Sequence, residues 1–351
     1  MLARSRSRSR AGSRRIAALS IAIAVALVMA ACRPLPGSSR VPTPIPTRTL
    51  TKLSVGLGYL PSVQFAPFYL AQQSRAYEGA GLEVTFQNEI DPNLVTLVGQ
   101  GALHIGVADG TSVIPAVSQG IPITYVATIY GSYPSIVFAK ASSGIKSAAD
   151  LAGKKIGIPG RYGSSWIMLQ ALLSSADLTP EDVEIVEYPD FGQGVAVQQD
   201  AVDAATGFAN NEPVQLELEG IDTVVLHIDD VIALPGPGLI TGTAMLESDN
   251  NAVARFISTT LAAMEDIAAD PEKGLEAAIV AVPELAADRV TQAAILDATI
   301  ATWAPPGGGD FGEIDEAGWE ASVDYLVTLG LVPNPVSVEQ LVQQVDILPV
   351  D

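Results

Sequence analysis

Several residue types that support catalysis, metal binding or nucleic-acid binding are scarce in this chain of 351 residues. It contains one cysteine and two histidines, so no disulfide can form within one chain, and neither a histidine-based triad nor a metal cluster is supported. We interpret His104 and His227, which lie in or beside predicted strands, as packed or edge-strand residues. After residue 31, 13 basic residues stand against all 39 acidic ones, which leaves a net charge of −26. Such a charge repels nucleic acid and anionic lipid, so no nucleic-acid partner is expected.

Basic residues are concentrated at the N-terminus. Six arginines between Arg4 and Arg15 precede an apolar run at residues 16–31, which is short for a transmembrane span. The run ends in Met29-Ala30-Ala31-Cys32, which resembles a lipobox with Met29 in place of the usual leucine. Residues 1–31 are therefore predicted to be a bacterial lipoprotein signal peptide, and Cys32 the lipidated residue. The alternatives are a chance cysteine behind an ordinary signal peptide, or a membrane anchor.

Residues 32–50 have the composition of a tether. Five prolines occur here among Ser, Thr and Gly, with no hydrophobic periodicity. Such a segment is extended and would hold a globular body away from a membrane. The sequence thus predicts a protein held at the extracytoplasmic face of the cell membrane by a lipid on Cys32.

The stretch at residues 51–74 predicts a strand, a turn and a helix. Apolar residues alternate with small or polar ones over 53–59, which is the period of a strand. Pro67 suits the first turn of a helix that begins near Phe65 or Ala66 and runs to Ser74. In an open α/β sheet, the turn between them lies at the carboxyl end of the strand, where ligands bind. Tyr59, Gln64 and Phe65 are therefore candidate ligand contacts.

Short apolar strands then alternate with helices along the chain. Strands are predicted at 82–86, 105–107 and 123–129, and helices at 93–101 and 112–119. After an extended segment at 135–140 and a short polar helix at 145–154, a second run has strands at 155–158, 183–187 and 201–206, and helices at 164–175, 192–199 and 212–219. The C-terminal part predicts helices alone, at 251–270, 271–282, 288–301, 314–330 and 337–345. This pattern predicts an α/β fold with doubly wound sheets, in a chain long enough for about two domains.

Several segments resemble a known family. They are Leu57-Gly58-Tyr59-Leu60-Pro61, Ala66-Pro67-Phe68-Tyr69-Leu70-Ala71-Gln72, Gly106-Val107-Ala108-Asp109-Gly110-Thr111, Asp150-Leu151-Ala152-Gly153-Lys154-Lys155-Ile156-Gly157 and Asn210-Asn211-Glu212-Pro213. These segments are similar to periplasmic solute-binding proteins of ABC importers, in the branch that includes binders of thiamine-pyrimidine precursors, sulfonates, nitrate and riboflavin. The resemblance covers nearly all of residues 53–348.

The resemblance implies a two-lobed periplasmic-binding-protein fold of type 2, with the ligand clamped between the lobes. Lobe 1 would comprise residues 51–136 plus 241–351, and lobe 2 residues 137–240. The chain would cross between the lobes at two hinges, near 134–140 and near 235–243. The implied partners are a small-molecule ligand and the permease and ATPase subunits of an ABC transporter.

Two turns at strand ends supply further candidate ligand contacts. Thr111 and Ser112 follow a strand and open a helix, so they could contact a ligand or simply cap the helix. The loop at 159–166 offers charge and a flat ring in Arg161 and Tyr162, followed by Ser164, with a surface loop as the alternative. Its Gly163 occupies the place where a phosphate-binding Walker loop needs lysine, so that loop type is excluded. We expect Trp166 to belong to the core.

A third turn carries amide side chains. Asn210, Asn211 and Glu212 follow an apolar segment, and asparagine amides offer the paired donors and acceptors that suit a uracil-like or pteridine-like edge. Helix capping is the alternative for the same residues, because Pro213 fits a first turn. Four rings at other strand ends could stack on a ligand or only pack, namely Tyr130, Tyr133, Tyr188 and Phe191.

An enzyme of the same fold is the main alternative to a binding protein. Thiamine-pyrimidine synthases resemble this chain but carry a Trp-x-Pro-Asn-x-x-His turn with a functional histidine. The matching positions here are Tyr59, Pro61, Ser62 and Phe65, so the asparagine and the histidine are both absent. We therefore predict a binding protein with no catalytic residue and no metal ligand, although a carboxylate mechanism stays open. The ligand-sensing part of a receptor would be expected to continue into a membrane span or a kinase region, and none is found before Asp351.

The expected ligand is a neutral, flat heterocycle with a polar edge. The candidate residues lack the clustered Arg and Lys that nitrate or a sulfonate would need, and the missing histidine turn weakens the case for a pyrimidine. Riboflavin fits best among the family's ligands, as transported solute and not as cofactor, and no cofactor is expected. A thiamine-pyrimidine precursor, or an anion of the sulfonate or nitrate type, remains the alternative.

Overall fold

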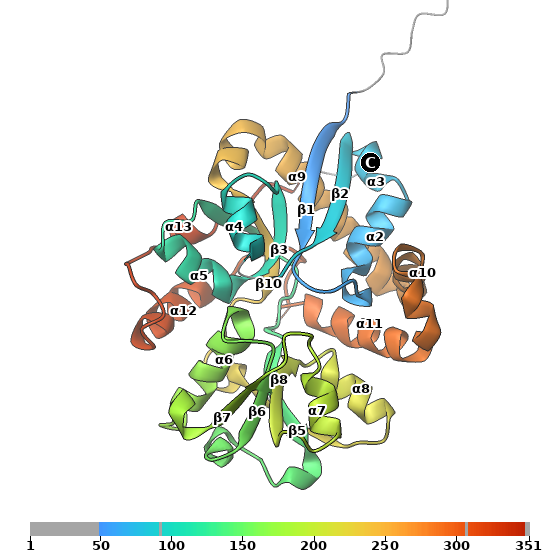
Figure 1. Ribbon diagram of the computed structural model, residues 1–351. Coiled ribbons are helices and arrows are strands. Elements are labelled where there is room, and N and C mark those ends of the chain that lie inside the picture. Colours follow the sequence, from blue (N-terminus) through green and yellow to red (C-terminus); the bar gives the residue numbers. More distant parts are fainter. Residues whose placement is uncertain (1–48, 91–92, 306–307, 348–351) are drawn as a thin grey trace, which may run out of the picture. The chain divides into compact units, whose positions relative to one another are not determined.

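The computed structural model describes residues 49–90, 93–305 and 308–347. The predicted signal peptide, Cys32 and almost all of the tether lie outside these residues. The described part of the chain contains two five-stranded sheets, which occupy the upper and lower halves of Figure 1. We call the upper one sheet A and the lower one sheet B, and each sheet with its covering helices a lobe.

Sheet A has the strand order β2-β1-β3-β10-β4. Strands β1 and β3 pair in parallel, as do β1 and β2, whereas β10 runs antiparallel between β3 and β4. Strands β3, β4 and β10 are almost continuously buried, as expected for a sheet covered by helices on both faces. The strands are β1 (Thr51–Leu57), β2 (Leu82–Asn88), β3 (Ile105–Asp109), β4 (Ile123–Thr128) and β10 (Pro237–Gly242).

Sheet B has the order β7-β6-β8-β5-β9. Strand β6 pairs in parallel with β7 and β8, whereas β5 runs antiparallel to β8 and β9. Its strands are β5 (Ser135–Lys140), β6 (Lys155–Ile158), β7 (Glu184–Glu187), β8 (Ala204–Phe208) and β9 (Thr223–His227).

The two antiparallel strands β5 and β10 are the ones that the chain enters when it changes lobes. The first residue of β5 pairs with the last residue of β8, Ser135 with Phe208, and the first residue of β10 pairs with the last of β3, Pro237 with Asp109. A chain that crosses directly from one sheet to the other must start its new strand at the near edge. The carboxyl ends of the parallel strands in both sheets therefore face the region between the lobes, where α/β proteins bind ligands.

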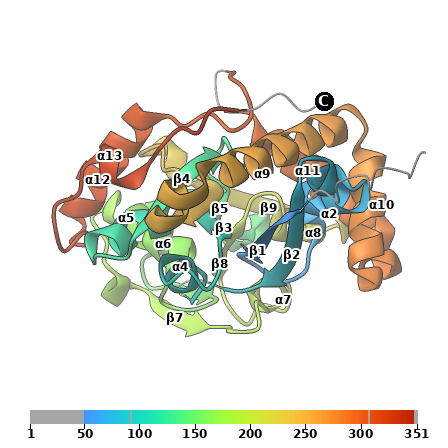
Figure 2. The same ribbon diagram turned by 90° about the horizontal axis from the view of Figure 1, so that it is seen from above.

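Helices cover both faces of sheet A. In Figure 2, α2, α10 and α11 lie on one side, and α5, α12 and α13 on the other. The first group comprises α2 (Ala66–Gln73), α3 (Ala76–Gly79), α9 (Thr243–Ala269), α10 (Pro271–Ala281) and α11 (Arg289–Trp303), with the 3-10 turns η1 (Val63–Phe65) and η6 (Pro283–Asp288). The second group comprises α4 (Asn93–Gly99), α5 (Gly110–Ser118), α12 (Glu316–Thr328) and α13 (Val338–Leu341).

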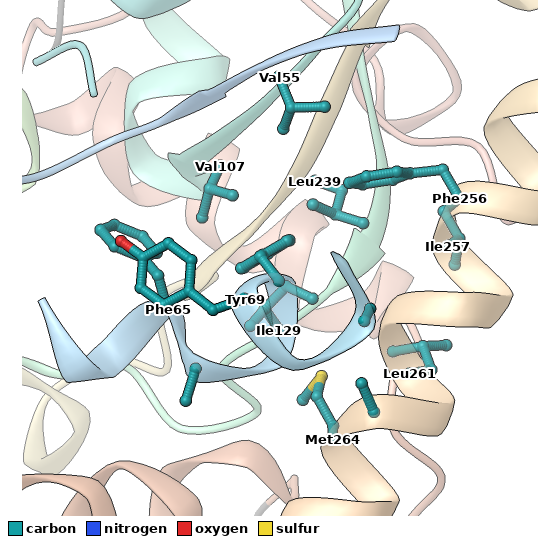
Figure 3. Packing of buried hydrophobic residues seen from close by; sticks show 14 of the residues in the cluster. Val55, Phe65, Tyr69, Val107, Ile129, Leu239, Phe256, Ile257, Leu261 and Met264 are labelled. Atoms are coloured by element: carbon teal, nitrogen blue, oxygen red, sulfur yellow. The ribbon is translucent and has the colours of Figure 1, made fainter. Parts of the chain in front are cut away.

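The larger core packs α2 and α9 against sheet A. Figure 3 shows Val55, Val107 and Leu239 of the strands facing Phe256 and Met264 of α9. The ring of Phe256 stacks on Tyr77, with centroids 5.1 Å apart and planes 5° apart, and it also stacks on Phe68 of α2 at 6.3 Å. The segment at 51–74 is thereby fixed to the C-terminal helices.

Sheet B is covered in the same way. Alternate residues of β5 point to opposite faces, so Ile136 and Phe138 join the core under α7 and α8, and Val137 and Ala139 join the core under α6. The helices are α6 (Gly163–Ser174), α7 (Gln193–Gln198) and α8 (Glu212–Leu218), with the 3-10 turns η2 (Ala141–Ser143), η3 (Ala148–Leu151), η4 (Pro180–Asp182) and η5 (Ile228–Asp230).

The predicted α/β class and the doubly wound arrangement are confirmed. The predicted helix at 145–154 is wrong in extent, because only the single turn η3 forms there. The second crossing was expected to extend to residue 243, but 237–242 form β10 of sheet A. Residues 237–240 therefore pair with lobe 1, and Ser135 and Ile136 pair with lobe 2, contrary to the expected boundaries at 136/137 and 240/241. Within the described residues, no helix is both long and apolar enough to cross a bilayer.

Candidate functional site

A cavity of about 120 Å³ lies where the carboxyl ends of the two sheets face each other. It is lined from lobe 1 by the turn after β1, the end of β3 and Tyr130, and from lobe 2 by the loops after β6, β7 and β8. Eight of the predicted contacts line it: Tyr59, Gln64, Phe65, Tyr130, Tyr162, Ser164, Asn211 and Glu212. Five do not: Thr111, Ser112, Arg161, Tyr188 and Asn210.

The turn after β1 brings three predicted contacts to the wall. Gly58 passes so close to β3 that a Cβ atom would lie 2.3 Å from the carbonyl oxygen of Val107, so no larger residue fits there. Ser62 caps η1 by accepting from the amide of Gln64, and Pro67 occupies the first turn of α2. These contacts fix the turn between β1 and α2 that carries Tyr59, Gln64 and Phe65.

Asp109, at the end of β3, was not among the predicted contacts, although it lies in one of the family-like segments. Its oxygen Oδ1 is enclosed and has no hydrogen-bond partner among the described residues. Burial raises the pKa of Asp109 to about 6, and a hydrogen bond with Ser164 of lobe 2 opposes the rise. The two neighbouring predictions, Thr111 and Ser112, are not among the lining residues, and the hydroxyl of Thr111 instead contacts the hydroxyl of Tyr133 at 3.4 Å.

The loop after β6 contributes Tyr162 and Ser164 but not its arginine. The guanidinium of Arg161 pairs with Glu187, with Nε 3.3 Å from Oε1, and lies 5.3 Å from the ring centroid of Trp166. Trp166 itself packs against the core of lobe 2, as predicted. The attraction of a carboxylate and an aromatic face thus holds the positive charge outside the cavity lining.

Glu212 is a buried carboxyl group, 8% exposed, at the start of α8. Its Oε2 accepts from the amide of Phe208 at 2.9 Å, and its Oε1 accepts from Nε2 of Gln193 at 3.3 Å. Burial raises the pKa of Glu212 to about 7, and the hydrogen bond from the backbone of Phe208 opposes the rise. Gly207 permits this arrangement, because a Cβ atom there would lie 2.6 Å from Oε2.

Asn210 links the lobes instead of lining the cavity. Its Nδ2 donates to Oε1 of Gln64 at 3.0 Å and to Oγ1 of Thr299 at 2.8 Å, so a residue of lobe 2 is bonded to two residues of lobe 1. We call these three residues the interlobe clasp. Asn211 does line the cavity, where it hydrogen-bonds with Tyr59 across the lobes.

Aromatic rings form much of the remaining wall. Tyr59 of lobe 1 meets Phe191 of lobe 2 edge to face, with centroids 5.0 Å apart. Burial raises the pKa of Tyr59, and the nearby carboxyl group of Glu212 adds to the rise, so its phenol stays protonated at neutral pH. Tyr188 was expected at the cavity but packs against the second core of lobe 2.

Phe191, one of the rings at strand ends that could stack on a ligand, lines the cavity. Sequence reasoning missed Asp109 and Gln193. Both lie at or just beyond the carboxyl end of a strand, so the rule that ligand contacts gather there is the signal that could have found them. Among the described lining residues, the ionisable side chains are Asp109, Glu212 and the tyrosines, and none is Lys, Arg or His.

The two histidines lie away from the cavity. His104 bonds through Nδ1 to the hydroxyl of Ser54 at 2.7 Å, and His227 is exposed at the end of β9. No group of three or more His, Cys, Asp or Glu that could hold a metal ion occurs in the described part of the chain.

The chain is similar to several known proteins. A family described as NMT1/THI5 like matches residues 62–274. The riboflavin-binding protein RibY of Chloroflexus aurantiacus is 31% identical over 314 residues, which cover 88% of this chain and 89% of that protein. The 4-amino-5-hydroxymethyl-2-methylpyrimidine phosphate synthase of Legionella pneumophila is 29% identical over 52% of this chain and 58% of that enzyme.

Solved structures share the fold. The alkanesulfonate-binding protein SsuA of Xanthomonas axonopodis pv. citri, bound to MOPS, aligns with a TM-score of 0.67 at 18% identity and covers 84% of this chain and 98% of that one. The aliphatic sulphonate-binding protein SsuA of Escherichia coli aligns with a TM-score of 0.66 at 17% identity and covers 85% and 94%. The two-lobed periplasmic-binding-protein fold is confirmed by these alignments. Because the family model matches residues 62–274 and a 31% identical relative covers most of the chain, this chain belongs to the NMT1/THI5-like family.

Proposed function

We propose that this protein captures a flat, uncharged heterocycle, with riboflavin favoured, between its lobes and delivers it to an ABC importer. The observation that carries the proposal is the character of the cavity lining, in which aromatic rings, amides and two carboxyl groups occur without a basic side chain among the described residues. A sulfonate or nitrate would face two carboxyl groups with no cation to offset its charge. The similarity to a riboflavin-binding protein over most of the chain supports the same choice.

The size of the cavity implies that a solute enters an open form. Sites for ligands of drug size have volumes of about 300 to 1,000 Å³, whereas this cavity has about 120 Å³. Hinge motion at the two crossings provides the room, as in other two-lobed binding proteins.

An aminopyrimidine is the second candidate. Its amino group donates hydrogen bonds, which suits the carboxyl groups of Asp109 and Glu212, and the Legionella relative is named for pyrimidine synthesis. The proposal of binding without catalysis rests on the missing histidine turn at Tyr59–Phe65 and on the binding-protein name of the longer match.

Calorimetric titration of the purified protein with riboflavin, the aminopyrimidine and an alkanesulfonate tests these candidates. We expect tight riboflavin binding, a yellow protein as isolated from cells, and quenched flavin fluorescence from stacking. Solute recovered after long incubation should be chemically unchanged by mass spectrometry. Conversion to a product would instead favour an enzyme, and heat only with the sulfonate would refute the ligand class.

The membrane attachment is part of the proposal and has its own prediction. Because the chain has one cysteine, Cys32→Ser removes the only lipid acceptor. We expect the variant protein in the soluble fraction after cell fractionation, whereas the parent stays with membranes. If Cys32→Ser remains in the membrane fraction after an alkaline wash, the apolar run at 16–31 is a true anchor and the lipoprotein proposal is wrong.

A further inference from the structure

Two enclosed oxygen atoms of the cavity residues lack a hydrogen-bond partner within the described structure. One is Oδ1 of Asp109, at the end of β3 in lobe 1, and the other is Oε1 of Gln193, at the start of α7 in lobe 2. Gln193 is only 1% exposed. Buried acceptors are almost always hydrogen-bonded in folded proteins. Two buried acceptor oxygens without a partner, one from each lobe and both in cavity residues, therefore indicate that a hydrogen-bond donor is missing.

The orientation of the Gln193 amide is fixed by its neighbour. Its Nε2 donates to Oε1 of Glu212 at 3.3 Å, while the second oxygen of Glu212 is held by the amide of Phe208. Turning the Gln193 amide over would bring its oxygen against a carboxyl oxygen, which is unfavourable whenever Glu212 is ionised. Ionised Glu212 is therefore a positioning residue that keeps Oε1 of Gln193 available as an acceptor, and the titrations are run at pH 8, above the pKa of Glu212 of about 7.

We propose that Asp109 and Gln193 determine ligand specificity by accepting hydrogen bonds from donor groups on the solute, one from each lobe. This inference rests on the proposed function and narrows it to solutes that carry N–H or O–H groups on more than one side. Riboflavin meets the requirement, with an N–H on its ring edge and hydroxyl groups on its side chain. Sulfonates and nitrate offer acceptors alone and would leave both oxygens unpaired.

The test combines variants with ligand analogues in calorimetric titrations. The variants are Asp109→Leu and Gln193→Met, which remove the acceptor oxygens and keep a side chain of similar shape. Their matched controls are Asp324→Leu, at an exposed residue of α12, and Gln198→Met, which lies on α7 outside the cavity lining. The ligands are riboflavin, 3-methylriboflavin, which lacks the ring N–H, and lumiflavin, which lacks the side-chain hydroxyls.

We expect each site variant to bind riboflavin at least tenfold more weakly than the parent, and each control within twofold of it. The parent should also bind at least one analogue tenfold or more weakly than riboflavin. This difference in affinity between riboflavin and the analogue should be smaller in the variant that lacks the matching acceptor. If both analogues bind the parent as tightly as riboflavin, the inference is overturned without reference to any variant's folding. Riboflavin binding unchanged by both variants overturns the inference while leaving the proposed function intact.

A failure of the proposed function would give a different experimental result from a failure of this inference. If the parent binds the aminopyrimidine and not riboflavin, the flavin assignment fails, and the same four variants titrated with the aminopyrimidine then decide the role of the two acceptors. Tight binding of an alkanesulfonate by the parent overturns both proposals.

Discussion

Glu212 shows how one buried carboxyl group makes stability depend on pH. Its pKa rises from 4.5 to about 7 on folding, so the folded protein binds this proton more tightly than the unfolded chain does. The stabilisation is fully present below pH 4.5 and is lost as the pH rises through 7. Tyr59, whose pKa is raised by burial and by Glu212, remains protonated over this range and does not change the sign.

Glu212→Gln should therefore change the pH profile of unfolding. Relative to this variant, the parent should lose about 2 to 3 kcal/mol of unfolding free energy between pH 5 and pH 8. Urea denaturation at both pH values measures the difference. Glu217→Gln, on the exposed side of the same helix, is the control and should follow the parent. Parallel pH profiles for the parent and Glu212→Gln would contradict the prediction.

The position of a strand end could be predicted from the sequence, but the direction of each side chain could not. Tyr59, Asn211 and Glu212 reach the cavity as expected, because turns at carboxyl strand ends face the cleft. Arg161 does not, because its guanidinium pairs with Glu187, 26 residues further along the chain, and lies over the ring of Trp166. Asn210 binds Gln64 and Thr299, a partnership that only the closed tertiary structure creates.

At the scale of elements, the stack of Phe256 on Tyr77 and Phe68 joins α9 to the N-terminal segment of lobe 1. Phe256 is completely buried, so Phe256→Ala removes the stack and leaves a cavity in the core. We expect a loss of about 3 to 5 kcal/mol in the free energy of unfolding, measured by urea denaturation. Val280→Ala, at a residue that is 65% exposed, should change it by less than about 0.5 kcal/mol. Equal effects of the two substitutions would show that this stack does not stabilise the lobe.

Helices and strands whose apolar residues recur with a clear period could be predicted from the sequence. Elements that form only because neighbouring strands pair with them could not. Helices α6, α10 and α11 follow their apolar spacing to within a few residues. Strand β10 was not predicted, because the segment Pro235-Gly236-Pro237-Gly238 has the composition of a loop. The strand forms because β3 and β4 bond to it on both sides, and Gly238 fits there because a Cβ atom would lie 2.1 Å from the hydroxyl of Tyr125.

At the scale of the whole molecule, the interlobe clasp favours the closed form. Asn210→Ala removes two hydrogen bonds that exist only when the lobes are together. Losing buried bonds of this kind costs about 1 to 3 kcal/mol, so the ratio of closed to open molecules should fall about fivefold to a hundredfold. The radius of gyration of the ligand-free protein, measured by small-angle X-ray scattering, should increase.

Gln170→Ala is the control for the clasp, because it breaks a bond to the carbonyl oxygen of Trp166 that lies within lobe 2 alone and outside the cavity lining. The affinity of Asn210→Ala should fall by the same factor for every ligand, since the clasp acts on closure and not on ligand chemistry. An unchanged radius of gyration, or a loss confined to one ligand, would show that Asn210 does not act as a clasp.

The small cavity and the clasp together have a consequence for the timing of release under the proposed function. A solute held between closed lobes leaves when they open, so its residence time depends on how often the hinge opens and not only on the strength of its contacts. Delivery as proposed would then depend on the receiving partner shifting the balance of the two lobes towards the open form. Slow spontaneous release in dilute surroundings and fast release on docking would follow from the same hinge.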